Sequence, residues 1–389
     1  MAPGSKTKSS GEDLSELPRD EGFVYLDHAA STPPWEQALV VYAALARSDY
    51  ANPSSRHSLG QQAREIYENG KEKFCDELGF HDGIFIHHAS ATEANNQVLS
   101  SFLCASVGHV FIGSDVHASL SWVAEAYPDR CSWIPLSPEG EYLLPEPKGR
   151  SLFLLNLVSQ DIGTLHETDS WSKLFGNSEV HLHLDAVQAV GKIPLNLDEL
   201  PFHSLSFSSH KFGGIKGSAG LLLRDKEVRP LLRGGAQEHA LRAGTENVSA
   251  LLGSLEAFHL TRKLYRDSEG HLQKMRSFLK ERLVEFPHRH ILNEPERGVP
   301  WIINLSFPGY LGTELVAGLS RFNIGVSTSS ACHQDVQTPP RAVSALGRNQ
   351  SEAIGSIRLS LHPHHTLSQL ERFLTSLKKC LDSLDQSSS

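Results

Sequence analysis

The chain has 389 residues, with 36 Lys and Arg against 45 Asp and Glu, so its formal net charge is −9. Hydrophobic residues make up 39% and charged residues 21% of the chain, which fits a globular protein of two or three domains and argues against disorder. The acidic balance disfavours nucleic acid and anionic membranes as partners, since both attract basic patches. No apolar run approaches the roughly 18–20 residues of a membrane span.

The two ends of the chain and its cysteines indicate a cytoplasmic protein. Residues 1–21 are polar and lack the apolar stretch of a secretory signal, and we expect them and residues 384–389 to be disordered. The cysteines are few, odd in number and widely spaced, which predicts neither a disulfide framework nor a Cys-x-x-Cys metal pair. A reducing compartment is therefore expected.

Short apolar runs alternate with helical patterns along the first 250 residues. Helices are predicted at Gln61–Leu78 and Thr92–Leu103, and Leu39–Ala46 is typical of a buried helix. The predicted strands are Ile84–His88, Val110–Gly113, Ser151–Val158, Val180–Asp185, Leu205–Ser208 and Ala219–Leu223. This alternation predicts an α/β fold with a mostly parallel central sheet flanked by helices.

The pattern changes near Leu251, where long helical stretches flank weaker strands. The helical stretches are 251–285 and 366–384, and the strands are 301–306 and 355–361. We therefore predict a large α/β domain over residues 22–250 and a smaller α+β domain over residues 251–383. The first 15 or so residues of the large domain are expected to pack on the small one.

The segment L-S-F-S-S-H-K-F-G-G (205–214) carries a strand into a turn rich in hydroxyl groups. Most loop lysines are solvated, but Lys211 follows an apolar strand, where desolvation lowers the pKa of an amine. A neutral amine reacts with an aldehyde cofactor. Ser208 and His210 are suitably placed to contact a phosphate.

Two interpretations compete for V-H-L-H-L-D-A-V-Q (180–188). A strand repeats every two residues, so His181, His183 and Asp185 share one face. That face either ligates a metal or places Asp185 against a pyridinium nitrogen, with Gln188 nearby. Histidines packed in a half-buried strand are the plain structural alternative. The chain shows no further His and Asp set with convincing ligand spacing, which weakens the metal interpretation.

Two segments have features of anion sites. In H-A-S-A-T-E-A-N-N (88–96) a helix begins near Thr92, and the free N–H groups at a helix N-terminus attract anions. An ordinary helix cap is the alternative. The glycine-rich loop R-G-G-A-Q-E-H-A-L-R-A-G-T-E-N (233–247) contains Arg242 and Thr245, which suit a phosphate or a subunit contact.

Two further residues stand out from their surroundings. Cys332 lies in the polar segment V-S-T-S-S-A-C-H (326–333), outside any apolar periodicity, where a thiolate can act as a nucleophile. Arg358 interrupts the apolar strand I-G-S-I-R-L-S-L (354–361) and needs an anionic partner, either a substrate carboxylate or a structural ion pair.

The order of these motifs resembles that of the cysteine desulfurase and selenocysteine lyase family, within the class V branch of fold-type I pyridoxal-phosphate enzymes. The resemblance covers roughly residues 23–380. Its motifs are Y-L-D-H-A-A-S-T (25–32), A-N-P-S-S (51–55), A-T-E-A-N-N (91–96), L-D-A-V-Q-A-V-G-K (184–192), S-F-S-S-H-K (206–211), L-R-A-G-T-E-N (241–247), S-S-A-C (329–332) and S-I-R-L-S-L (356–361). Each motif is weak alone, but the set is specific.

The resemblance assigns a role to each matching position. It makes Lys211 the lysine that bonds pyridoxal 5'-phosphate and moves the α-proton, Cys332 the nucleophile, and His117 the histidine stacked on the ring. The remaining cofactor contacts that it implies are Asp185, Gln188, Gln160, Ala91, Thr92, Ser208, His210 and, from the neighbouring subunit, Thr245. Arg358 and Asn52 are implied to bind the substrate.

The implied activity is the removal of sulfur from L-cysteine, which yields alanine and a persulfide on Cys332. A homodimer and a sulfur-acceptor protein are implied as partners. Selenocysteine lyase, acting on L-selenocysteine, uses the same residues, and another class V aminotransferase or β-lyase reaction remains open. So do a non-catalytic subunit with this fold and a metal hydrolase based on His181 and His183; the family itself uses no metal.

The chain departs from the family pattern at a few positions. V-S-Q-D-I-G (158–163) has Gln160 where an asparagine is usual, Ser90 replaces the usual glycine before A-T-E, and His362-Pro363 replaces a Gly-Arg pair. The stretch 114–150 is also shorter than usual. These differences indicate a divergent member.

Overall fold

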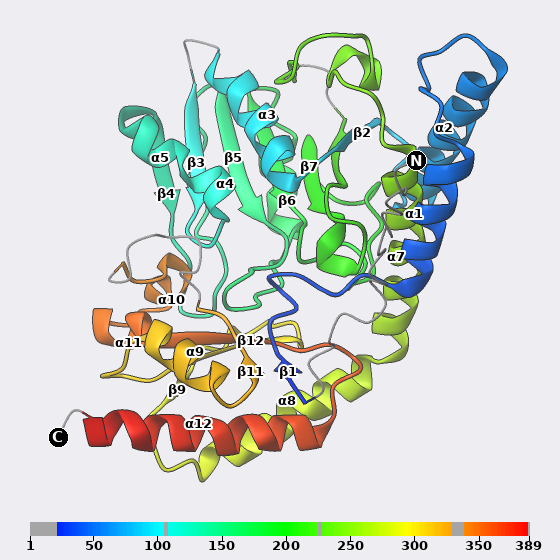
Figure 1. Cartoon of the computed structure of the whole chain (residues 1–389). Helices are drawn as coiled ribbons and strands as arrows, with labels where there is room; N and C mark the ends of the chain where they lie inside the picture. The colour runs from blue at the N-terminus through cyan, green and yellow to red at the C-terminus, as the bar shows by residue number, and fades with distance from the viewer. Residues whose placement is uncertain (1–21, 105–107, 225–227, 329–337, 388–389) are drawn as a thin grey trace, which may run out of the picture.

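A computed structural model describes residues 22–104, 108–224, 228–328 and 338–387, and its strands form three sheets (Figure 1). The central sheet has seven strands: β2 (Ile84–His88), β3 (His109–Gly113), β4 (Cys131–Ile134), β5 (Ser151–Asn156), β6 (Val180–Asp185), β7 (Ser204–Ser208) and β8 (Ala219–Leu223). The order across it is β2-β8-β7-β6-β5-β3-β4. Strands β4, β3, β5, β6 and β7 are parallel, whereas β8 is antiparallel to both of its neighbours. The predicted α/β class, the mostly parallel sheet and its six predicted strands are confirmed.

Twelve α-helices are assigned among the described residues. They are α1 (Glu36–Ser48), α2 (Ser58–Leu78), α3 (Ala91–Leu103), α4 (Ala118–Ser121), α5 (Val123–Ala126), α6 (Ser172–Phe175), α7 (Val248–Asp267), α8 (Glu269–Val284), α9 (Gly312–Ser320), α10 (Arg341–Ala345), α11 (Gln350–Ile354) and α12 (Leu367–Ser387).

Alternate side chains of the central strands are buried on opposite faces. Leu152 and Leu154 of β5 pack in one cluster with residues of α3, α4 and α5, whereas Phe153 and Leu155 belong to the cluster that contains α2 and α7. On β6, Leu182 and Leu184 face the second cluster. His181, His183 and Asp185 therefore share the face that α3 covers, as the period of two predicts.

The second part of the chain, drawn in yellow to red, gathers beneath the central sheet in Figure 1. Strand β10 (Ile302–Ser306) pairs antiparallel with both β9 (Ile291–Leu292) and β12 (Ser356–Ser360). The chain start joins this part, because β1 (Val24–Tyr25) pairs in parallel with β11 (Ile324–Gly325). An isolated bridge between Asp27 and Ser360 continues this contact toward β12.

Three helix predictions need correction. The stretch 251–285 is two helices, because Ser268 has a φ of −114° and separates α7 from α8. The proposed disordered tail begins too early, since α12 continues to Ser387. The run Leu39–Ala46 is not fully buried: α1 packs on α7 along one side only, which leaves Leu39 38% and Val40 59% exposed.

Candidate active site

Lys211 lies in a single 3-10 turn, η4 (Ser209–Phe212), directly after β7. The turn ends at Gly213, whose φ of 76° favours glycine. The amine of Lys211 donates hydrogen bonds to the carbonyl oxygens of Ala29, at 2.8 Å, and Ala30, at 3.0 Å. Thr32 Oγ1 donates to the backbone oxygen of Lys211 at 3.2 Å. The segment after β1 therefore holds both ends of the lysine in place.

Asp185 lies at the carboxyl end of β6 and is buried. Its Oδ1 accepts a hydrogen bond from the backbone N–H of Val187 at 3.0 Å, and its Oδ2 accepts one from Asn95 Nδ2 at 3.4 Å. Burial raises the pKa of the Asp185 carboxyl, while these donors and the nearby His117 and Lys211 oppose the rise. A cation at this carboxylate would stabilise its charged form.

Gln188 connects two amines. Its Nε2 donates to the Ala29 oxygen at 2.8 Å, the same oxygen that Lys211 contacts, and its Oε1 accepts from Lys192 Nζ at 3.2 Å. Lys192 is buried, and burial, together with the charges of Lys211 and Arg358, lowers its pKa to about 7. A second, buried amine is thus linked to Lys211 through Gln188 and the Ala29 carbonyl.

His117 caps the amino end of α4. Its Nδ1 accepts from the backbone N–H of Ser119 at 3.1 Å and lies 2.9 Å from Ser119 Oγ. His117 lines a cavity of about 180 Å³ together with Lys211, Gln160, Asp161 and Arg358. The structure therefore brings four predicted site residues, His117, Lys211, Gln160 and Arg358, to one cavity.

Arg358 projects from β12 and is buried, 6% exposed. Its Nη2 lies 2.9 Å from Asp27 Oδ1, and its Nη1 donates to the backbone oxygen of Gln160 at 3.1 Å. Among the described residues, no hydrogen-bond partner lies within reach of Arg358 Nε. The guanidinium is thus fixed in place and keeps a buried donor for an anion.

The predicted phosphate contacts meet at the ends of three adjacent strands. His88 and Ser208 both lie opposite Ala219, so β2 and β7 end at the same level on either side of β8. The helix α3 follows β2 and begins with Ala91 and Thr92, whose N–H groups lie in the first turn and have no partner within the helix. This edge of the sheet can therefore bind an anion.

Two residues near this anion site have defined local roles. Ser90, in place of the family's usual glycine, caps α3, because its Oγ accepts from the Glu93 N–H at 3.1 Å. His210 Nδ1 lies 3.2 Å from Ser31 Oγ, and burial, with Lys211 beside it, lowers the pKa of His210 to about 4. The imidazole of His210 is therefore neutral near pH 7.

Asn52 and Thr245, like the predicted cofactor contacts Asp185, Gln188, Ala91, Thr92, Ser208 and His210, do not line the Lys211 cavity. Asn52 is exposed in the loop before α2, where its Oδ1 accepts from the Ser54 N–H at 2.8 Å. Thr245 is exposed and lines a separate cavity of about 200 Å³ with Glu238 and Arg242. Cys332 lies in 329–337, outside the described residues, so its predicted place stays a prediction.

The His362-Pro363 departure contributes to a group of buried histidines. His28 stacks on His362 with ring centroids 4.7 Å apart, and His365 meets His28 edge-on at 5.2 Å. Burial, with the other histidines and Lys192 nearby, lowers the pKa of His362 to about 3 and that of His28 to about 2. These rings are therefore neutral packing groups near pH 7.

Three residues of the site were not predicted as such. Asp27 pairs with Arg358 and could have been noticed as the one carboxylate of Y-L-D-H-A-A-S-T. Asp161 lines the cavity, and burial raises its pKa to about 7 although the Arg358 charge opposes the rise. Asn95 of α3 contacts Asp185, but an amide in a helix carries no distinctive signal in the sequence.

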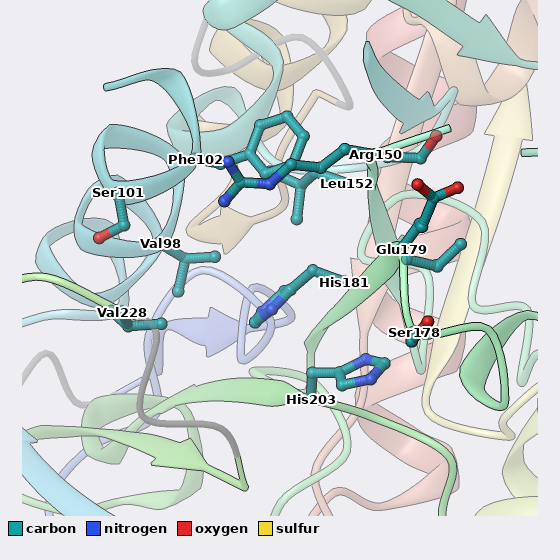
Figure 2. A pocket seen from close by; sticks show the side chains of 12 residues that line it. Val98, Ser101, Phe102, Arg150, Leu152, Ser178, Glu179, His181, His203 and Val228 are labelled. Atoms are coloured by element: carbon teal, nitrogen blue, oxygen red, sulfur yellow. The ribbon is translucent and has the colours of Figure 1, made fainter. Parts of the chain in front are cut away.

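A larger cavity, of about 410 Å³, lies at the opposite edge of the sheet, where β5, β6 and β7 begin (Figure 2). His181 and His203 line it, with ring centroids 5.2 Å apart. His181 Nε2 and His183 Nδ1 both lie 2.8 Å from Ser204 Oγ, and His183 Nε2 lies 3.0 Å from Asn95 Oδ1. Within the part of the chain that the structure describes, no three His, Cys, Asp or Glu residues are grouped to hold a metal. The metal-hydrolase alternative therefore has no ligand set there.

Comparison with known proteins agrees with this geometry. The aminotransferase class-V family model matches residues 24–373. The cysteine desulfurase IscS of Dictyoglomus turgidum is 32% identical over 376 residues, which cover 93% of this chain and 95% of that protein. The IscS-like cysteine desulfurase of Mycobacterium tuberculosis is 30% identical, with coverage of 87% and 91%.

The fold gives the same result. The solved structure of a NifS-like protein from Rickettsia africae superposes with a TM-score of 0.83 at 25% identity, covering 92% of this chain and 99% of that one. No helix in the described segments is both long enough and apolar enough to cross a membrane. The chain therefore belongs to the aminotransferase class-V family of fold-type I pyridoxal-phosphate enzymes, and within it to the cysteine desulfurases.

Proposed function

We propose that this protein is a pyridoxal-phosphate-dependent cysteine desulfurase, which converts L-cysteine to L-alanine and leaves the sulfur on Cys332 as a persulfide. The observation that carries the proposal is the convergence of Lys211, His117 and Arg358 on one cavity, with Asp185 directly behind it. Membership of the desulfurase family supports the same reaction.

The donors and acceptors of this chain fit pyridoxal phosphate. The buried Asp185 carboxylate is suited to a protonated pyridine nitrogen, because a cation would offset the cost of its burial. Gln188 would meet the ring hydroxyl, with Gln160 nearby, and Ala91, Thr92, Ser208 and His210 would hold the phosphate. When bound through Lys211, the cofactor supplies an electron sink for the charge that develops at the substrate α-carbon.

The residues around the cavity bind the substrate, transfer its α-proton and attack its sulfur. Arg358 binds the substrate carboxylate through Nε, which has no partner in the described part of the chain, while Asp27 and the Gln160 carbonyl hold the guanidinium still. Lys211 Nζ removes the α-proton and later returns it, and the Ala29 and Ala30 carbonyls keep this amine directed at the cavity. The Cys332 thiolate attacks the γ-sulfur, so that an S–S bond forms as the substrate C–S bond breaks.

The assembly that we propose is a homodimer whose second subunit supplies Thr245 to the phosphate, with Asn52 at the substrate end. In its support, Thr245 and Asn52 are both exposed and neither lines the Lys211 cavity of its own chain, and α1 exposes an apolar side. A partner protein then accepts the sulfur. We also propose the division into domains 22–250 and 251–383, and the cytoplasm as the compartment, because a persulfide-forming thiolate requires reducing surroundings.

Mass spectrometry of the holoenzyme after incubation with L-cysteine tests the proposed function. We expect Cys332 to gain one sulfur atom and alanine to form in equal amount, while Cys332→Ser binds the cofactor and forms neither product. Alanine or pyruvate without added sulfur on Cys332 would instead identify another class V reaction. A Cys332→Ala variant that retains turnover of L-selenocysteine but not of L-cysteine would identify a selenocysteine lyase, since selenols ionise more readily.

A further inference from the structure

A chain of hydrogen bonds runs along β6, on the face that α3 covers, from the cavity in Figure 2 to the carboxylate of Asp185. It begins at His181, passes through Ser204 Oγ to His183 Nδ1, with both distances 2.8 Å, and continues from His183 Nε2 to Asn95 Oδ1 at 3.0 Å. Asn95 Nδ2 then lies 3.4 Å from Asp185 Oδ2. Asn95 and His183 are both fully buried.

The chemistry of these groups determines the direction of every bond. Burial lowers the pKa of His183 to about 3, so its ring is neutral and carries a single N–H. Asn95 Oδ1 can only accept, so the His183 proton lies on Nε2 and His183 Nδ1 accepts from the Ser204 hydroxyl. Ser204 Oγ in turn accepts from His181 Nε2. This direction agrees with the other end of the Asn95 amide, where Nδ2 faces the Asp185 carboxylate, whose ionised oxygen only accepts.

The Asn95 amide is a branch point. One Nδ2 proton is directed at Asp185, and the other is donated to Ser119 Oγ at 2.8 Å. Ser119 Oγ then gives its own proton to His117 Nδ1, which the Ser119 backbone N–H also contacts. When His117 is neutral, its remaining proton must therefore lie on Nε2. Asn95 thus donates to a carboxylate of the active site and, through Ser119 Oγ, supplies a second donor to His117 Nδ1 beside the Ser119 backbone N–H.

We propose that Asn95 is a positioning residue that fixes the donor pattern of Asp185 and reinforces the Nε2–H tautomer of His117, and that His183 stabilises its orientation. This inference rests on the proposed function only in taking Asp185 and His117 as cofactor contacts. If the Asn95 amide were reversed, its oxygen would face the Asp185 carboxylate, and the Nδ2 donors to Asp185 and Ser119 would be lost. If Asn95 and His183 only provided hydrogen-bond partners for each other in the protein core, replacing His183 would leave the tautomer of His117 unchanged.

Two measurements on three variants test the proposal. His183→Phe removes the donor to Asn95, and His183→Gln retains an amide donor at the position of Nε2. His109→Phe is the matched control, because His109 on β3 also pairs with a serine, Ser132 Oγ at 2.8 Å, but this bond is not part of the chain that reaches Asp185. The measurements are the pyridoxal phosphate Kd, by titration of apoprotein, and the 15N shifts of the His117 ring in the same apoprotein.

We expect the His183→Phe Kd to rise by about tenfold, the loss of roughly one hydrogen bond to a charged group, and the His183→Gln Kd to stay within about threefold. The His117 shifts should change from a single Nε2–H form to a mixture in His183→Phe alone. His109→Phe should match the wild type in both measurements.

The proposal is overturned if His183→Phe matches the wild type in both the Kd and the His117 shifts. Should this variant not fold, Asn95→Asp keeps the side-chain size but removes the Nδ2 donor, and the same two changes are expected of it. A wild-type protein that does not bind pyridoxal phosphate would contradict the proposed function instead, while the His117 shifts would still decide whether Asn95 and His183 control that ring.

Discussion

The two edges of the central sheet carry similar residues but offer different chemistry. At the edge where β5, β6 and β7 begin, His181, His203 and Arg150 line a cavity of about 410 Å³. At the opposite edge, Lys211, His117 and Arg358 line one of about 180 Å³. The larger, more conspicuous cavity is therefore not the one at which the proposed catalytic groups meet.

Hydrogen bonding explains the difference. At the first edge, His181 is bonded to Ser204, His203 Nδ1 accepts from the Leu182 N–H at 2.9 Å, and Arg150 lies over the Phe102 ring at 5.1 Å. At the second edge, Arg358 Nε is buried and has no partner among the residues that the structure describes, and strands end in turns and a helix N-terminus that expose backbone donors. Ligands of open α/β sheets bind at the carboxyl ends of the strands for this reason.

Replacing Lys211 should reduce the reaction rate more than any other substitution considered below. Lys211→Ala removes both the covalent attachment of the cofactor and the group that moves the α-proton, so the rate should fall at least about 10³-fold. The absorbance near the visible edge should disappear at the same time. Lys216→Ala, an exposed lysine five residues later, is the control and should retain both properties. Cofactor that remains covalently bound to Lys211→Ala after dialysis would refute the assignment.

A second test replaces one arginine at each edge of the sheet, in two separate variants. Arg358→Gln should lower kcat/KM about 10²-fold, chiefly through KM, because the substrate carboxylate loses a buried charged donor. Arg150→Gln at the other edge serves as the matched control. Arg358→Gln also leaves the Asp27 carboxylate without its ion-pair partner, which can destabilise the fold. Thermal midpoints of both variants separate this destabilisation from the change in KM. Equal KM values for the two variants would mean that Arg358 does not meet the substrate.

A third test concerns His183, which lies between the two edges. Its folded pKa of about 3 is below the unfolded value near 6.5, so the folded state binds fewer protons and loses stability as the pH falls through this window. At pH 5 the loss is about 2 kcal/mol, or about 30-fold in the unfolding equilibrium. Urea unfolding of His183→Gln should therefore be less sensitive to pH between 7 and 5 than the wild type. Parallel profiles would show that His183 is protonated in the folded state.

The smallest effect is expected at the larger cavity itself. Glu179→Gln alters the charge of its lining without touching any group assigned to the reaction, so kcat/KM should stay within about twofold. Steady-state assays on the holoenzyme provide the check. A tenfold change in kcat/KM would show that the two edges of the sheet are functionally coupled.

Local patterns predicted most of the central sheet, because strands of alternating or continuous apolar residues are bounded by turn residues close in the sequence. These patterns were less reliable for the ends and the exposed faces of helices. Ser268 breaks one predicted helix into two, and α12 extends to Ser387 because its amphipathic pattern is stronger than its polar final residues suggest. Exposure of Val40 was also missed, since periodicity does not reveal which side of α1 finds a partner.

Local patterns along the chain were enough to identify the types and order of the reactive residues, namely an amine after a strand, a carboxylate at a strand end and an arginine within an apolar strand. Those features are local, and turns and strand ends are encoded within a few residues. The contacts between Arg358 and Asp27, 331 residues apart, and between His183 and Asn95, 88 residues apart, were visible only in the folded chain. Contacts between residues so far apart in the sequence depend on the order of the strands and on how the helices pack on the sheet. The spacing of residues along the chain encodes neither.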